Sequence, residues 1–385
     1  MVQTKGIATV RFYVFSPRFH LRPKNTDWLY NKYLPRVSEF TDGLEIYLQQ
    51  AILPSLITNI RLAAAIAHNR LGTPLPALLQ PEHESRFSLR DVRRSRADVI
   101  FGHSPTNIHH LPLICHTGPI WEQAMRDRGT PEAEIAAEKA VKLRTVLRSE
   151  LVTLNSEAGA DSIRALDPPS TGKIRSIPFF LPHLRPASAD AVEDKWRNTQ
   201  KIHLLFVGRE ARRKGLPAVL AAFQAADTLY PGRLELRVVS TFADGPVPLP
   251  EMPNLTVTGE AGRAEVDELM RQAHILMMPS RFETYGWVYL EAMAAGAIAM
   301  ACDAPTQQEI LAGGTAGILT QPTDEAVTAA LLKLLSAPQE MEALARRGWQ
   351  RIREVYSPER VAERMKQLGF EAQERFRSRG SIART

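Results

Sequence analysis

Residues 274–296 read HILMMPSRFETYGWVYLEAMAAG, which is the most informative stretch of this chain. The apolar run His274 to Met278 has the length of a buried strand, and the alanine-rich run after Gly286 is typical of a helix. Gly296 stands where helices commonly end, because glycine readily adopts the left-handed conformation of a C-terminal cap. A buried strand followed by a helix is the repeating unit of an α/β protein.

Two glutamates bracket the turn between that strand and that helix. Glu283 lies in the loop and Glu291 on the second turn of the expected helix, with seven residues between them. Unpaired backbone N–H groups at a helix start attract phosphate, and glycine lets a ligand approach closely. The two carboxylates could then accept hydrogen bonds from hydroxyl groups on either side of an anion. Glutamates near a helix start also occur by chance, so this pattern alone does not identify a site.

A second strand, loop and helix lies roughly 70 residues earlier in the chain. The apolar run 201–207 is followed by Gly208, by the basic loop REARRKG at 209–215 and by a helical pattern. Basic side chains such as Arg209 and Lys214 could bind an anion at the end of this strand. The alternative is a solvated basic turn, and we expect Arg212 and Arg213 to be plain surface charges.

Together, the two motifs resemble the G-R-x4-K-G and E-x7-E elements of the retaining glycosyltransferases of family 4, which have the two-domain GT-B fold. The resemblance implies that Arg209 and Lys214 neutralise the diphosphate of a nucleotide-sugar donor. It implies that Glu283 holds hydroxyls of the donor sugar and that Glu291 holds the ribose. The backbone amides expected to meet the diphosphate are those of Tyr285, Gly286, Trp287 and Val288.

Two histidines in the first half end short apolar runs, at His103 and His116. Open α/β sheets place ligands at the ends of strands. His116, in Cys-His-Thr-Gly, resembles the family's active-site histidine that faces the donor sugar from the first domain, and His103 could line the same cleft. A satisfied structural histidine is the alternative for each. We expect no metal site with His109 and His110, because no Cys or carboxylate recurs nearby at metal-ligand spacing.

The resemblance covers residues 97–370 and is strongest from 202 to 310, and the start of the chain departs from the family pattern. Many family members carry a glycine pair after the first strand, where this chain has SPRFHLR at 16–22. The charged residues of that loop could contact phosphate or acceptor, although exposed loop charges are the simpler account. They are Arg18, His20 and Arg22.

Composition narrows the class of protein. The chain has 385 residues, 44% of them hydrophobic, enough for two domains with separate cores. Cys115 and Cys302 lie in apolar runs and indicate reduced thiols, as in a cytoplasmic protein. We expect neither a signal peptide nor a membrane-spanning helix.

The net charge of +6 fits an anionic donor or membrane surface. The basic residues are scattered without interleaved aromatics, so we expect no nucleic-acid partner.

Alternating strands and helices predict an α/β protein with two doubly wound, Rossmann-like parallel sheets. The expected strands are 8–15, 44–48, 97–102, 112–116, 150–155, 173–178, 201–207, 234–239, 254–258, 274–278, 297–302 and 316–319. Helices are expected at 52–71, after Thr130-Pro131 and from Ser357-Pro358 onward. In the implied GT-B arrangement, two domains face each other across a cleft. Its parts are an acceptor-side domain at 1–187, a nucleotide-sugar domain at 188–360 after a linker at 182–199, and a helix at 361–385 that crosses back to the first domain.

The resemblance predicts a retaining, metal-independent hexosyltransferase that moves a hexose from a nucleoside diphosphate sugar to a hydroxyl acceptor, without a cofactor. Many family members build polysaccharides or lipid-linked glycans at the cytoplasmic membrane face, which implies a glycan acceptor and leaves peripheral membrane association open. Two alternatives remain. One is a GT-B phosphorylase, although no lysine lies in a typical pyridoxal phosphate motif. The other is a catalytically silent GT-B subunit that scaffolds a partner, against which the intact basic and acidic motifs argue.

Overall fold

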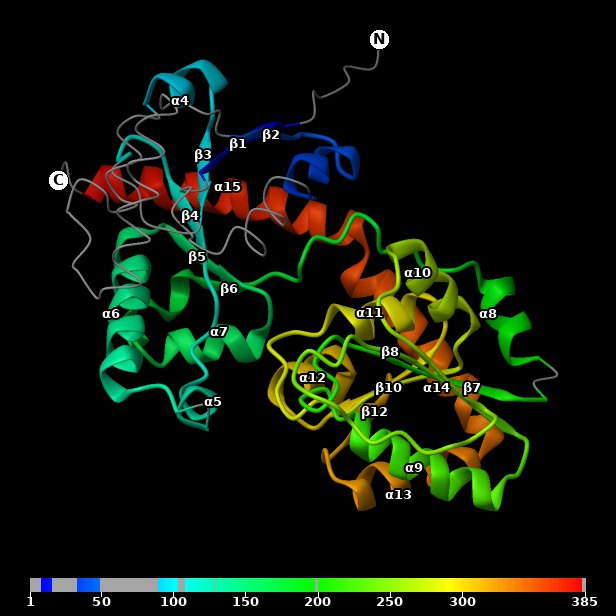
Figure 1. Ribbon diagram of the computed structural model, residues 1–385. Coiled ribbons are helices and arrows are strands. Elements are labelled where there is room, and N and C mark those ends of the chain that lie inside the picture. Colours follow the sequence, from blue (N-terminus) through cyan, green and yellow to red (C-terminus); the bar gives the residue numbers. More distant parts are fainter. Residues whose placement is uncertain are drawn as a thin grey trace, which may run out of the picture. The chain divides into compact units, whose positions relative to one another are not determined.

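A computed structural model describes residues 8–15, 33–48, 89–102, 108–127, 129–197 and 200–382. The chain forms two compact α/β units (Figure 1). Unit 1 consists of residues 1–182 and 358–385, and unit 2 of residues 183–357. His103, the loop 16–22 and the expected helix 52–71 lie outside the described residues.

The described elements of unit 1 alternate between strands and helices, and its last helix comes from the end of the chain. They are β1 (Val10–Phe15), η2 (Leu34–Glu39), β2 (Leu44–Leu48), α4 (Leu89–Ser95), β3 (Val99–Gly102), β4 (Leu113–His116), α5 (Glu122–Asp127), α6 (Glu132–Arg148), β5 (Leu151–Leu154), α7 (Glu157–Arg164), η5 (Pro168–Lys173), β6 (Ile174–Ser176) and α15 (Pro358–Ile382). The strand order is β2-β1-β3-β4-β5-β6, and every pair is parallel. All residues of β3, β4 and β5 are buried, as expected for central strands covered on both faces.

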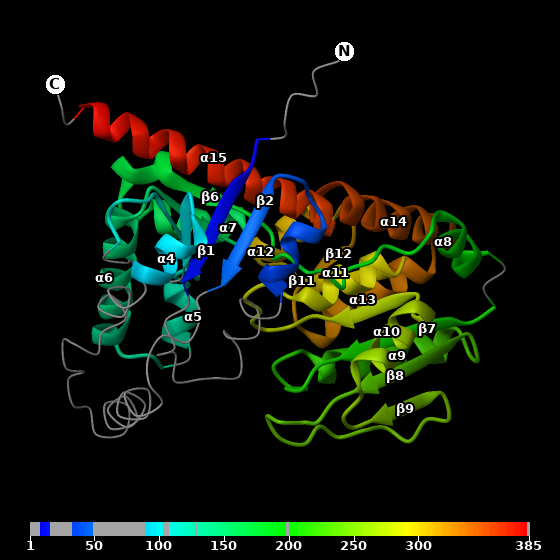
Figure 2. The same ribbon diagram turned by 90° about the horizontal axis from the view of Figure 1, so that it is seen from above.

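Helix α15 packs against β1, β3 and β4 and so belongs to unit 1, as Figure 2 shows. Gly369 makes this contact possible, because a Cβ at that position would lie 2.4 Å from the ring of Phe12 on β1. Two ion pairs join α15 to other parts of unit 1. They are Arg175 with Glu371 at 2.5 Å and Arg379 with Glu150 at 2.8 Å. The helix begins at Pro358, as the sequence predicts.

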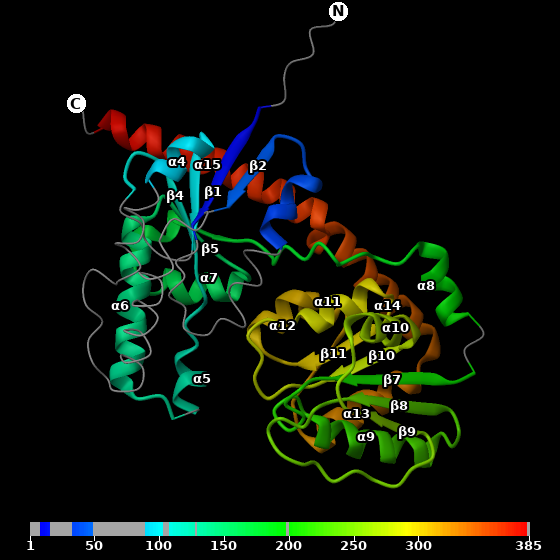
Figure 3. The same cartoon turned by 45° about the horizontal axis from the view of Figure 1, so that its top comes forward.

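Unit 2 repeats the strand and helix alternation. Its elements are α8 (Ala189–Trp196), β7 (Ile202–Val207), α9 (Leu216–Leu229), β8 (Leu234–Val239), β9 (Leu255–Thr258), α10 (Arg263–Gln272), β10 (Ile275–Met278), α11 (Trp287–Ala294), β11 (Ile298–Cys302), α12 (Pro305–Ile310), η6 (Ala312–Gly314), β12 (Ile318–Thr320), α13 (Asp324–Leu335), α14 (Pro338–Arg351) and η7 (Ile352–Tyr356). The strand order is β12-β11-β10-β7-β8-β9, again entirely parallel. Helices α10, α11 and α14 cover one face of the sheet, and α9 and α13 cover the other (Figure 3).

All twelve expected strands are present, and their ends agree with the prediction within two residues. The expected linker at 182–199 is more structured than a bare connection, because it contains α8. Ser188 caps this helix by accepting a hydrogen bond from the backbone N–H of Ala191, and the side chains of Val192 and Trp196 are buried in unit 2. Within the described part of the chain, no helix combines the length and the apolar composition needed to cross a membrane.

Candidate functional site

The two charged motifs lie at the same edge of the unit 2 sheet. Strands β7 and β10 are parallel neighbours, so their carboxyl ends point the same way. The basic loop 208–215 follows β7, and the loop 279–286, called the acidic loop because it carries Glu283, follows β10. Parallel strand ends are where α/β sheets place ligands. Two segments roughly 70 residues apart in sequence therefore meet at one place.

Gly215 permits the close approach of the two loops. Its φ is +87°, and a Cβ there would lie 2.4 Å from the carbonyl oxygen of Pro279. Only glycine fits this position without moving the backbone. The backbone N–H of Arg281 donates a hydrogen bond of 2.9 Å to the carbonyl of Arg213, so the loops are also joined through the main chain.

Lys214 and Glu283, one from each motif, form an ion pair through Nζ and Oε2. Their side chains are only 15% and 11% exposed, so the pair is shielded from bulk water. Partial burial strengthens the attraction between the charges, although it also costs their hydration. The structure thus brings together the cation expected at the diphosphate and the carboxylate expected at the donor sugar.

Arg209 contrasts with this pair because it is exposed. Its guanidinium makes no hydrogen bond or ion pair with any of the residues that the structure describes. Its backbone carbonyl is fixed by the N–H of Ala243 at 2.8 Å. The main chain therefore holds the residue in place and leaves its charged group available to an anion.

Arg213 corrects one expectation from the sequence. It is not a plain surface charge: its side chain is half-buried, and Nη1 donates to the carbonyl oxygen of Phe282 in the acidic loop. Its guanidinium also pairs with Glu210 at 2.6 Å. Arg212, by contrast, is exposed as expected and donates to the carbonyl of Pro246. Arg213 therefore braces the basic loop against the acidic loop.

Asp244 is a site residue that the sequence analysis missed. Its carboxylate accepts hydrogen bonds from the backbone N–H groups of Arg212 at 3.2 Å and Arg213 at 2.7 Å. Burial would raise the pKa of Asp244, but these backbone donors outweigh it and hold the pKa below the ordinary value. The only signal in the sequence is an aspartate in a loop, which is too common to single out a site.

Gly286 forms the start of α11, with φ +91°. The turn is held from two sides: Tyr289 Oη donates to the carbonyl of Met278 at 2.8 Å, and Gln307 Nε2 donates to the carbonyl of Tyr285 at 3.0 Å. The backbone of 285–288 therefore has a fixed path, and its helix start presents N–H groups of the kind that bind phosphate.

The predicted helix stop at Gly296 is confirmed. Its φ is +74°, and the N–H of Gly296 donates to Met293 O while that of Ala297 donates to Ala292 O. This is the bonding pattern of a Schellman cap. Glu291 accordingly lies on the second turn of α11, as expected.

Glu291 is 11% exposed and has two partners in unit 2. His183 Nε2 lies 3.1 Å from Oε1, and Arg263 Nη1 lies 2.6 Å from the same oxygen. Burial would raise the pKa of Glu291, but the hydrogen bond to His183 and the charge of Arg263 outweigh it and hold the pKa below its ordinary value. The carboxylate is therefore ionised at neutral pH. Neither partner was named from the sequence.

His116 ends β4 in unit 1 and is 7% exposed. Its Nδ1 lies 3.0 Å from the hydroxyl of Thr153. Burial, with a smaller contribution from the charge of Lys142, lowers the pKa of His116 to about 4. The imidazole is therefore neutral at pH 7, which suits it to hydrogen bonding with an uncharged group.

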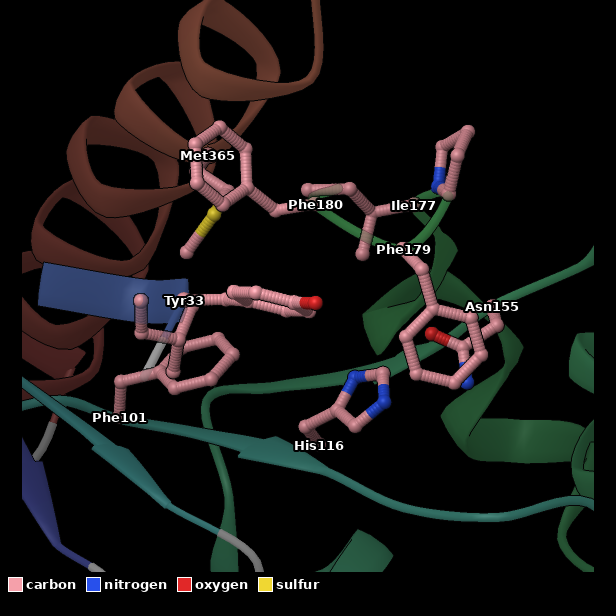
Figure 4. Close-up of a pocket in the computed structure, with 10 residues that line it drawn as sticks. Tyr33, Phe101, His116, Asn155, Ile177, Phe179, Phe180 and Met365 are labelled. Carbon is pink, nitrogen blue, oxygen red and sulfur yellow. The ribbon is translucent and has the colours of Figure 1, made fainter. Parts of the chain in front are cut away.

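A pocket beside His116 is lined by aromatic and other uncharged side chains (Figure 4). Its empty volume is about 370 Å³, including space open to solvent. The buried Oδ1 of Asn155 has no hydrogen-bond partner among the described residues. The described lining residues are Tyr33, Leu34, Phe101, His116, Asn155, Ile177, Pro178, Phe179, Phe180 and Met365.

Metal ligands do not gather in the described residues, where no group of three or more His, Cys, Asp and Glu side chains is placed to hold an ion. His109 and His110, considered as ligands in the sequence analysis, are both exposed.

Comparisons with known proteins agree with the two motifs. Residues 201–337 match a family model described as Glycosyl transferases group 1. The chain is 28% identical over 239 residues to D-inositol 3-phosphate glycosyltransferase 1 of Catenulispora acidiphila. That match covers 57% of this chain and 56% of the relative, so the chain spans little more than half of that protein's length.

Solved structures resemble the chain over almost its whole length. HepE of Anabaena, crystallised in complex with UDP, has a TM-score of 0.58 at 14% identity, and the match covers 93% of this chain and 98% of HepE. WaaG, a glycosyltransferase involved in lipopolysaccharide biosynthesis, has a TM-score of 0.53 at 14% identity, with 92% and 98% covered. At such identities the likeness concerns the fold. The chain therefore has the GT-B fold predicted from its sequence, and its residues 201–337 match the group 1 glycosyltransferases.

Proposed function

We propose that this chain is a retaining, metal-independent glycosyltransferase of family 4 that transfers a hexose from a nucleoside diphosphate sugar to a hydroxyl acceptor. The observation that carries the proposal is the pairing of Lys214 with Glu283 at the carboxyl edge of the unit 2 sheet, beside the exposed Arg209. All three residues lie in the segment that matches the group 1 glycosyltransferases.

The donor would bind along this edge. Arg209 and Lys214 would contact the diphosphate together with the N–H groups at the start of α11, and Glu291 would accept hydrogen bonds from the ribose. A UDP-sugar is the first donor to test, because the similar HepE was crystallised with UDP and with UDP-glucose.

Catalysis would depend on charge at the leaving group. Departure of a nucleoside diphosphate concentrates negative charge on the bridging oxygen, and fixed cations stabilise that charge most in the transition state. Lys214 supplies one such cation, and Glu283 holds its ammonium group in place before the donor binds. Because these cations would occupy the place of a metal ion, we propose that the reaction requires none.

His116 would contribute as a neutral group. Since its pKa of about 4 keeps the imidazole uncharged at pH 7, it would donate or accept a hydrogen bond at a sugar hydroxyl and would not serve as a general acid. The acceptor would be a glycan or another hydroxyl compound. WaaG acts in lipopolysaccharide biosynthesis and the Catenulispora relative is named for an inositol phosphate acceptor, which supports this class.

The experiment is a donor screen with the purified chain. Thermal shift against UDP-, GDP- and ADP-sugars would find the donor, and release of nucleoside diphosphate would then be measured with and without EDTA. We expect release in both conditions. Loss of release with EDTA, restored by Mn²⁺ or Mg²⁺, would contradict metal independence.

Other outcomes separate the remaining alternatives. Sugar 1-phosphate formed only when inorganic phosphate is added would identify a phosphorylase. No shift and no release with any donor would identify a silent subunit. For the product, the one-bond carbon-proton coupling at the anomeric centre, measured by NMR, would show whether the donor's configuration is retained.

A further inference from the structure

The carboxylate of Glu291 is held on one side only. His183 and Arg263 both contact Oε1, at 3.1 Å and 2.6 Å. Oε2 has no hydrogen bond or ion pair to any residue that the structure describes. One oxygen of the carboxylate is therefore anchored, and the other remains able to accept two hydrogen bonds from a ligand.

Glu291 and its two anchoring groups come from three separate parts of unit 2. His183 precedes α8, Arg263 is the first residue of α10, and Glu291 lies on α11. Pairs within one helix form easily from sequence spacing, but this cluster exists only because the fold brings the three segments together. Arg263 also pairs with Asp267 at 2.8 Å, one turn further along α10, which limits the freedom of its guanidinium.

Burial makes the charge and the orientation of the Glu291 carboxylate depend on these partners. Glu291 is 11% exposed, and a carboxylate so shielded from water needs partners to remain charged. Arg263 and His183 supply them, and Arg263 is itself only half exposed. Without these partners the carboxyl group would be free to rotate, and Oε2 would lose its fixed direction.

We propose that His183 and Arg263 are positioning residues that aim Glu291 Oε2 at the two vicinal ribose hydroxyls of the donor nucleotide, and thereby set its selectivity for ribose over deoxyribose. This inference rests on the proposed function. Vicinal hydroxyls are two adjacent donors, and a single carboxylate oxygen with two lone pairs is matched to them. A site built to bond such hydroxyls discriminates strongly against a ligand that lacks them.

Calorimetry with UDP and 2′,3′-dideoxy-UDP tests this proposal directly. The variants are Arg263→Met and His183→Leu, with His183→Gln as the conservative change that keeps a donor. Arg271→Met is the matched control, because Arg271 lies at the far end of the same helix, is 62% exposed and contacts Glu268. Every variant is compared with wild type at the same pH and ionic strength.

We expect wild type to bind UDP at least about tenfold more tightly than the dideoxy nucleotide. Arg263→Met and His183→Leu should each weaken UDP binding about fivefold and leave the dideoxy nucleotide within about twofold, so that selectivity narrows. His183→Gln should retain most of the selectivity, and Arg271→Met all of it. In a Glu291→Gln background, Arg263→Met should cause no further loss of selectivity, because both changes act on one contact.

Two results would overturn the inference alone: variants that keep the full preference for UDP, or variants that lose affinity for both nucleotides equally. The second would place Arg263 at the diphosphate or in the stability of the fold. A wild-type chain that binds none of UDP, GDP and ADP would instead overturn the proposed function, and this inference with it. If GDP or ADP proves the tighter ligand, its ribose and dideoxyribose forms replace those of uridine.

Discussion

The two units present different chemistry at the carboxyl ends of their strands. In unit 2 the candidate residues are charged: Arg209, Lys214, Glu283 and Glu291. In unit 1 the pocket beside His116 has no charged side chain among its described lining residues. A site for a nucleoside diphosphate needs fixed charges, whereas an uncharged, aromatic pocket suits the face of a neutral ring. Among the described residues, the comparison therefore favours the charged edge of unit 2 over the pocket of unit 1 as the place for the proposed diphosphate.

The two sites also differ in how they are assembled from sequence. Arg209, Lys214 and Glu283 come from two loops, each shorter than ten residues, that follow adjacent strands, and Glu291 comes from the helix after the second loop. The neutral pocket collects residues from separate segments between Tyr33 and Met365. A loop that binds phosphate leaves a local pattern of glycine and charge, but a packed aromatic pocket leaves none. This is why the candidate site of unit 2 can be predicted from the sequence far better than the pocket of unit 1.

The largest expected effect is on stability, and it comes from a substitution that breaks the contact between the two loops of unit 2. Gly215→Ala places a Cβ 2.4 Å from the carbonyl oxygen of Pro279 at a φ of +87°. The left-handed backbone should cost about 1–2 kcal/mol and the clash about 1–3 kcal/mol more in the free energy of unfolding of unit 2. Urea unfolding measures the sum.

Gly232→Ala is the matched control for that prediction. Gly232 also lies in unit 2 and has a φ of +71°, but a Cβ there would meet nothing within 4 Å. It should therefore show only the backbone cost of about 1–2 kcal/mol. Equal destabilisation by the two substitutions would show that the close approach of the loops is unimportant.

Stability against acid can be compared between the units, because among the described residues each unit has one buried histidine. Burial is the main cause that lowers the pKa of His116 in unit 1 and of His274 in unit 2 to about 4, from an ordinary value of 6.5. The unfolded chain therefore binds more protons between these values, so stability is lost as the pH falls from about 6.5 to about 4. This difference in pKa between the unfolded and the folded chain corresponds to about 3 kcal/mol of unfolding free energy for each histidine.

Substitution separates the two contributions. His116→Gln and His274→Gln should each flatten the loss of unfolding free energy between pH 7 and pH 4 for the unit that contains them. His110→Gln should change nothing, since His110 is exposed. If neither buried variant altered the slope of stability against pH, proton uptake at these residues would not limit acid stability.

Every strand that the structure describes could be predicted from the sequence. Buried parallel strands are continuous apolar runs, and those at 202–207 and 275–278 are unmistakable because charged loops follow them. The polar segment 182–199 was less informative, since α8 is short and buries only one side. A two-residue signal such as Val192 and Trp196 is too weak to separate a helix from a linker.

The candidate site could be predicted only in part. Lys214, Glu283 and Glu291 carry a motif, and the structure gives each a defined partner. Arg213 and Asp244 act through backbone groups, which any sequence offers, so no pattern marks them. His183 and Arg263 were missed for a related reason, because long-range contacts depend on the whole fold.

Removal of the cation in the ion pair should have the largest effect on catalysis. Lys214→Ala should lower kcat about 10²-fold or more, because the role proposed for the ammonium is to stabilise the leaving group more in the transition state than in the ground state. Steady-state kinetics with the identified donor measures this. Lys201→Ala is the control, since Lys201 lies just before the start of β7, at the end of the strand away from the basic loop. Its side chain is 53% exposed and pairs with Glu235. Unchanged turnover of a folded Lys214→Ala protein would remove Lys214 from the diphosphate site.

The smallest expected effect distinguishes the two glutamates of unit 2. Glu291→Gln should weaken the binding of free UDP by about 1–3 kcal/mol, because it would remove the charged acceptor proposed for the ribose. Glu283→Gln should leave free UDP binding unchanged or slightly tighter. Its carboxylate pairs with Lys214, so its neutralisation releases the ammonium for the diphosphate. With UDP-glucose, Glu283→Gln should instead cost affinity, since contacts to the sugar are lost. Calorimetry with both ligands and both variants decides the matter: similar losses of UDP affinity in the two variants would show that Glu283 and Glu291 do not divide the donor between them.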